Sequence, residues 1–148
     1  MKVIRNVVIV AVVYYFLARL SLNLAYENSN ASPIWPPSGF ALAMVLIFGR
    51  KVLSGVFVGA FVANFLTFTS SLEEVTLTAS MPFLFMSLII ALGNTFEAFL
   101  GHYLLNKTKS VNFLDGSNEL LKFSLIAVLI SFSGSLIGSL TLLYGGVI

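Results

Sequence analysis

The chain has 148 residues, of which 58% are hydrophobic and only 9% are charged, and its formal net charge is +2. Because soluble domains carry about 25% charged residues, this composition excludes an ordinary water-soluble globule and predicts an integral membrane protein. The basic residues are too few and too scattered to indicate a nucleic-acid partner. The absence of cysteine excludes thiolate chemistry.

A membrane-spanning helix needs about 20 mostly apolar residues, and five apolar segments near that length follow one another along the chain. We expect helices over residues 3–26, 34–49, 52–70, 79–105 and 120–144. The first segment is longer than the apolar core of a cleaved signal peptide, about 7–15 residues, so we expect it to be retained. The predicted fold is therefore all-α, a single polytopic transmembrane bundle of about five helices.

Basic residues lie in alternate loops of this layout. They occur near the start of the first segment at Lys2 and Arg5, between the second and third at Arg50 and Lys51, and after the fourth at Lys107 and Lys109, while Lys122 opens the fifth. The other two loops hold Glu27, Glu73 and Glu74 and no basic residue. Since positive loops stay in the cytoplasm, we predict a cytoplasmic N-terminus and an external C-terminus.

Small residues recur at helical spacing and predict faces where membrane helices pack closely. The third segment carries Gly55 and Gly59 one turn apart. The fifth carries a row of small residues at Ser131, Gly134, Ser135, Gly138 and Ser139. We interpret these as packing faces within the chain. The alternative is that segment 120–144 forms an interface with a second copy or with a partner membrane subunit.

Two charged residues, Arg19 and Glu97, fall inside the apolar segments, where each costs about 2.5–3.5 kcal/mol on insertion scales. Arg19 lies past the middle of the first segment toward its outer end, and Glu97 lies past the middle of the fourth toward its inner end. At about 1.5 Å per residue, the two are roughly 14 Å apart along the membrane normal. We therefore predict that they do not form a direct salt bridge.

Around Arg19 the sequence predicts a small pocket that opens outward and favours anions. Its candidate residues are Arg19, Trp35, Ser38 and Asn64. Pro36 and Pro37 begin the second segment, and a helix N-terminus offers free N–H groups and a partial positive charge. The alternative is that Trp35 belongs to the aromatic belt at the interface and that Arg19 reaches lipid headgroups.

On the predicted inner side, Asn94 and Glu97 are three residues apart and so are neighbours on one helix. Three interpretations remain open: a hydrogen-bonded packing contact, for example with Tyr14 or Tyr15, a proton or cation step in transport, and a switch contact. A zinc site usually takes three or four protein ligands, more than His102 and Glu97 provide. With no nucleophile–base pair or phosphate-binding glycine loop either, the sequence predicts no metal site, no cofactor and no enzyme.

Four segments resemble the bacterial membrane-associated sensor domain of the first type: PIWPPSGFALA at 33–43, FGR at 48–50, GVFVGAF at 55–61 with Asn64, and ALGNTFEA at 91–98. The resemblance covers residues 32–105 and is carried mainly by the Trp-Pro-Pro-Ser-Gly motif and the Gly-Arg turn. It implies architectural or sensing roles for the motif positions Trp35, Pro36, Pro37, Gly39, Asn64, Asn94 and Glu97.

The resemblance implies an inner-membrane input domain of about eight helices, usually fused to a histidine kinase, diguanylate cyclase or phosphodiesterase, with a mostly undefined ligand. Five helices without an output domain predict a fragment, a truncated relative, or a subunit completed by another chain. We expect a sensory or signal-transducing module in the bacterial inner (plasma) membrane that takes an unknown small ligand. The alternatives are a small substrate-binding membrane subunit of a transporter and a purely structural membrane subunit.

Overall fold

The computed structural model describes residues 1–24, 32, 34–70, 76–108 and 116–147. Its elements are five α-helices and one short 3-10 turn: α1 (Lys2–Leu22), α2 (Pro36–Phe48), η1 (Arg50–Val52), α3 (Leu53–Thr69), α4 (Leu77–Lys107) and α5 (Ser117–Tyr144). No strand occurs in these ranges, so the predicted all-α fold is confirmed. The helix bounds agree with the predicted ones to within four residues. The largest difference is at α1, which ends at Leu22.

Four of the helices are long and apolar enough to cross a membrane, and α2 is the exception. It has 13 residues and is therefore about 20 Å long, against about 30 Å for the hydrocarbon core of a bilayer. Its last residue is Phe48, and the next residue, Gly49, has a φ of 77°, which suits glycine and turns the chain into η1. In η1, Arg50 and Lys51 are exposed. The predicted second span is thus too short to cross the bilayer alone.

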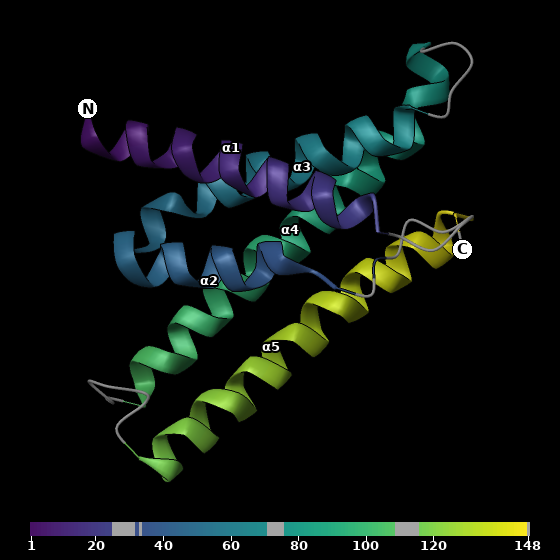
Figure 1. Ribbon diagram of the computed structural model, residues 1–148. Coiled ribbons are helices and arrows are strands. Elements are labelled where there is room, and N and C mark those ends of the chain that lie inside the picture. Colours follow the sequence, from purple (N-terminus) through teal and green to yellow (C-terminus); the bar gives the residue numbers. More distant parts are fainter. Residues whose placement is uncertain (25–31, 33, 71–75, 109–115, 148) are drawn as a thin grey trace.

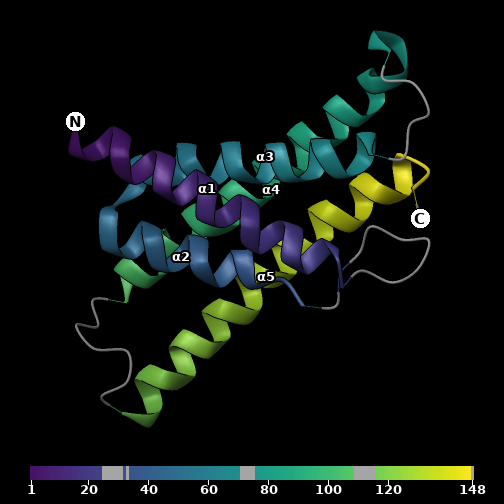
Figure 2. The same cartoon turned by 45° about the horizontal axis from the view of Figure 1, so that its top comes forward.

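The tightest helix contact joins α1 to α3, which lie side by side in both views (Figures 1 and 2). Gly55 and Gly59 provide it, because both are buried and face the α1 backbone. A Cβ atom at Gly55 would stand 2.5 Å from the Val7 carbonyl oxygen, and one at Gly59 would stand 2.6 Å from that of Ala11. Around this contact the largest core cluster forms, with Tyr14 fully buried at its centre.

Helix α4 connects the rest of the bundle, since it packs against α2, α3 and α5. Helix α5 packs principally on α4 and lies at the edge of the bundle (Figure 1). Side chains of α5 fill glycine positions of α4: a Cβ atom at Gly93 would overlap Ile137, and one at Gly101 would overlap Ile130. Most of the other large apolar side chains of α5 are exposed, as expected for a helix that faces lipid.

Candidate functional site

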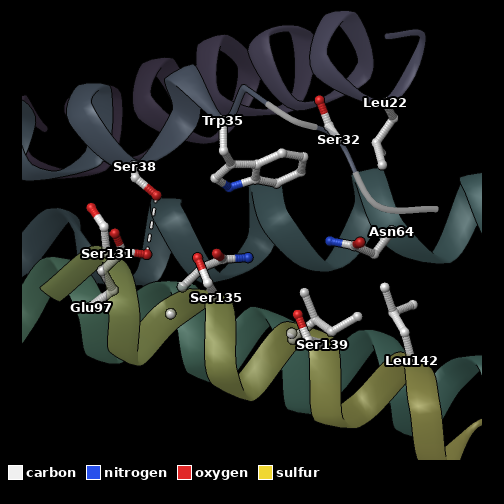
Figure 3. Close-up of a pocket in the computed structure, with 14 residues that line it drawn as sticks. Leu22, Ser32, Trp35, Ser38, Asn64, Glu97, Ser131, Ser135, Ser139 and Leu142 are labelled. Atoms are coloured by element: carbon white, nitrogen blue, oxygen red, sulfur yellow. Dashed lines mark hydrogen bonds between the residues drawn. The ribbon is translucent and has the colours of Figure 1, made fainter. Parts of the chain in front are cut away.

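A cavity of about 370 Å³ lies between α2, α3, α4 and α5. This volume falls at the small end of the roughly 300–1,000 Å³ that ligand pockets occupy. Hydroxyl and amide side chains line much of it, at Ser32, Ser38, Asn64, Asn94, Ser131, Ser135 and Ser139. Trp35, Glu97 and several apolar or glycine residues complete the described lining. Figure 3 shows α5 presenting its three serines toward Trp35 and Asn64 across this space.

The carboxyl group of Glu97 joins three helices at one end of the cavity. It comes from α4, and the residue is only 4% exposed. Its Oε2 atom accepts a hydrogen bond from Ser38 Oγ of α2 at 3.0 Å, the dashed line in Figure 3. On the α5 side, a Cβ atom at Gly134 would overlap Glu97 Oε2. Glycine at 134 therefore leaves the space that the carboxyl group occupies.

The start of α2 forms the wall of the cavity that faces α5 (Figure 3). Trp35 is the N-cap residue, and Pro36 and Pro37 are the first two residues of the helix. Proline carries no N–H group, so this helix start has fewer free donors than an ordinary N-terminus. The Ser38 N–H already donates to the Trp35 carbonyl oxygen at 3.3 Å. The start of α2 therefore contributes to the site mainly through the Trp35 indole and the Ser38 hydroxyl.

Two asparagines complete the polar wall from α3 and α4. Asn64 is 4% exposed, and its Nδ2 atom donates to the Ala60 carbonyl oxygen at 2.8 Å. Asn94 Nδ2 is buried and has no hydrogen-bond partner among the described residues. Leaving such a donor unpaired costs about 1–3 kcal/mol. A bound group that accepts a hydrogen bond from Asn94 would recover part of this free energy.

The structure brings together residues that the sequence analysis placed at two depths. Trp35, Ser38 and Asn64 line the cavity, and so do Asn94 and Glu97, which were assigned to a separate inner contact. The reason is the length of α2. A 13-residue helix is about 10 Å shorter than the hydrocarbon core of a bilayer. Its first turn reaches Glu97, to which Ser38 donates a hydrogen bond.

Arg19 is absent from the described residues that line the cavity. Its Nη1 atom donates to Thr67 Oγ1 of α3 at 2.7 Å, while the described partner of Glu97 is Ser38 rather than Tyr14 or Tyr15. Arg19 and Glu97 thus form their described hydrogen bonds with different residues. The described lining of the cavity thus includes the Glu97 carboxyl group and does not include the Arg19 guanidinium group.

The sequence analysis missed the contribution of α5 to the cavity. Ser131, Ser135 and Ser139 were interpreted as part of a packing face or a subunit interface, and in the structure they line the cavity. Four-residue spacing places them on one face of α5. Their polarity is the feature that distinguishes them, because a face that packs only against an apolar helix does not require three hydroxyl groups.

A family model matches residues 6–148 of the chain, and its family is MASE1, membrane-associated sensor domain 1. The match covers nearly the whole chain, more than residues 32–105 on which the resemblance was based. The resemblance is therefore confirmed. No curated protein and no solved structure matches the chain.

Proposed function

Because the chain belongs to the MASE1 family, we propose that it is a sensory input module of a signalling system. Its stimulus is a small molecule that binds in the cavity between α2 and α5. The module acts by changing how its helices pack, and it carries out no chemical reaction itself. Its site residues are the cavity residues Trp35, Ser38, Asn64, Asn94 and Glu97.

The observation that supports this proposal is the contact of Glu97 with both Ser38 and Gly134. Ionisable residues inside membrane segments are costly and mark functional sites. Since α5 packs principally on α4, a ligand in the cavity would contact α2 and α3 on one side and α5 on the other. If a ligand binds one arrangement of these helices more tightly than another, it shifts the equilibrium between the two arrangements by the difference in its binding free energy.

We propose the same orientation as the charge pattern predicts, with the N-terminus in the cytoplasm of a bacterial cell and the protein in its inner membrane. The exposed Arg50 and Lys51 between α2 and α3 support it, because basic residues favour cytoplasmic loops. In this orientation the Trp35 end of the cavity lies in the outer half of the membrane. Ligands then reach it from outside the cell.

A cavity-filling variant tests the sensory site. Gly138 lines the cavity, and a Cβ atom there meets no atom within 4 Å, so Gly138→Leu fills the space without forcing helices apart. Gly116 is exposed, equally unobstructed and outside both the motif and the cavity lining, which makes Gly116→Leu the control. In a thermal-shift screen of water-soluble metabolites in detergent, we expect hits that stabilise the wild type and Gly116→Leu but not Gly138→Leu. Hits that stabilise all three proteins equally contradict the proposed site.

The change in helix packing is measured by spin labelling, which the absence of native cysteine makes simple. Labels at the exposed Phe96 and Leu129 report the distance between α4 and α5. Labels at the exposed Val12 and Val58 report the distance between α1 and α3. A stabilising compound should change the distance distribution of the first pair and leave that of the second. An unchanged first pair would contradict a sensory mechanism based on α5.

The short α2 also favours a second candidate, a substrate-binding membrane subunit of a transporter. Transporters commonly bind substrate near the bilayer midplane, where interrupted helices end, and α2 begins at such a depth. Proteoliposomes distinguish the two functions. Accumulation of a stabilising compound inside them supports transport, whereas binding without accumulation supports sensing.

A further inference from the structure

The charge of the cavity comes from one residue. Glu97 is the only acidic or basic side chain among the described residues that line it, and Glu97 is 4% exposed. Its described hydrogen-bond partner, Ser38, is neutral. The ion pair of the described chain joins Lys122 to Glu119, away from the cavity lining. A buried carboxyl group is either neutral by protonation or paired with a cation. The described lining holds no cationic side chain, so a cation that pairs with Glu97 in this cavity has to come from the ligand.

An aromatic ring, the indole of Trp35, lines the same cavity as this carboxyl group. Figure 3 shows the Trp35 ring extending over the cavity from the same end of α2 that holds Ser38, which is bonded to Glu97. Tryptophan is the side chain that attracts cations most strongly through its ring face. A cation placed between the indole and the carboxyl group would interact favourably with both.

The remaining walls indicate further groups on the ligand. Ser131, Ser135 and Ser139 form a row of hydroxyls along α5, and Asn94 Nδ2 lacks a partner among the described residues. The buried Asn94 Nδ2 would be left unpaired by a purely apolar cation. The three serines are exposed, and their hydroxyls offer further hydrogen bonds to hydroxyl or amide groups of a ligand. No cationic side chain lines the described cavity, so a ligand carboxylate would find no counter-charge.

We propose that this cavity binds a small organic monocation, a protonated or quaternary amine that also carries hydroxyl or amide groups and no carboxylate. The inference rests on the proposed function, because it assigns the chemical class of the ligand that the sensory cavity takes. Glu97 binds the ammonium group, Trp35 covers it, and the α5 serines with Asn94 bind the polar groups.

Three pairs of matched compounds test this class on the purified full chain in buffer free of glycerol and amines. They are serinol with glycerol, ethanolamine with ethylene glycol, and choline with its neutral isostere dimethylbutanol. We expect at least one cation to raise the melting temperature of the wild type by several degrees, and its neutral partner to have no effect. Removing one member of a buried charge pair costs enough that Glu97→Gln should weaken binding of that cation by more than about tenfold.

A second pair of variants keeps the test independent of the stability of Glu97→Gln. Ser135→Lys places an ammonium group of the chain itself in the cavity and should abolish the response to the cation, while Ser135→Met, of similar length, should retain at least part of it. Neutral partners that stabilise as well as the cations overturn the proposal, as does a wild type that responds to no cation. Either result leaves the cavity free to bind another ligand class. Failure of the proposed function itself would appear in a different experiment, the thermal-shift screen, in which hits would then stabilise Gly138→Leu and the wild type equally.

Discussion

The contact between α1 and α3 gives the sharpest stability prediction, at Gly59. A Cβ atom there would stand 2.6 Å from the Ala11 carbonyl oxygen and 3.0 Å from Tyr14 Cβ. Ordinary van der Waals contact begins at 3.4 Å, so the first distance is about 0.8 Å too short. The obstructing oxygen belongs to a helix backbone and cannot rotate away. Gly59→Val therefore requires the two helices to separate.

The magnitude follows from the size of this overlap. Overpacking a tightly packed core costs about 1–3 kcal/mol, and a separation of 0.5–1 Å forfeits about a quarter to a half of the dispersion energy of each contact involved. The two branching methyl groups of valine add to the overlap, and the gain in helix propensity over glycine is only a few tenths of a kcal/mol. We expect Gly59→Val to lower the free energy of unfolding by about 2–3 kcal/mol.

Unfolding in mixed micelles of increasing SDS content measures this loss, and Trp35 is the only tryptophan, so its fluorescence reports on the bundle. Gly116→Val is the control, because a Cβ atom at this exposed glycine meets nothing within 4 Å. Its effect should stay within about 0.5 kcal/mol. Equal stability of Gly59→Val and Gly116→Val would refute the close approach of α1 and α3.

Three further predictions concern the site and the topology. Gly134→Ala displaces the Glu97 carboxyl group from Ser38, so a cation that stabilises the wild type should stabilise this variant much less, and an equal thermal shift would contradict the geometry. Arg19→Ala removes a hydrogen bond to α3, and such bonds are worth about 0.6 kcal/mol in membrane proteins. The thermal shift that the cation produces should persist in this variant, since Arg19 does not line the described cavity. A cysteine at Gly116 should resist an impermeant thiol reagent added to intact cells and one at Thr76 should react, and the opposite pattern would invert the orientation.

Much of the fold was predictable because its causes are local. Continuous apolar runs fix where helices lie, and small residues such as Gly55 and Gly59 mark where two backbones approach. The site was predictable only in part. Trp35, Ser38 and Asn64 stand out by their motif and their polarity, but their relation to Glu97 depends on the depth at which α2 begins. That depth depends on where an irregular segment ends and a helix starts, which sequence patterns locate poorly.

The location of Arg19 shows a second limit. The sequence places Arg19 within a candidate membrane span, but which neighbour it contacts depends on the rotation of α1 about its axis. That rotation follows from the glycine contacts of α3, which direct Tyr14 into the core. Arg19 is consequently directed to Thr67 of α3. Tertiary packing determines this rotation, and the periodicity of α1 alone does not.

The separation between the packing helices and the cavity-lining helix has a consequence for the proposed site. The contacts that hold α1 and α3 together share none of the three serines that α5 presents to the cavity. Under the proposed function, single substitutions along α5 would therefore change which ligand is bound and leave the contact between α1 and α3 intact.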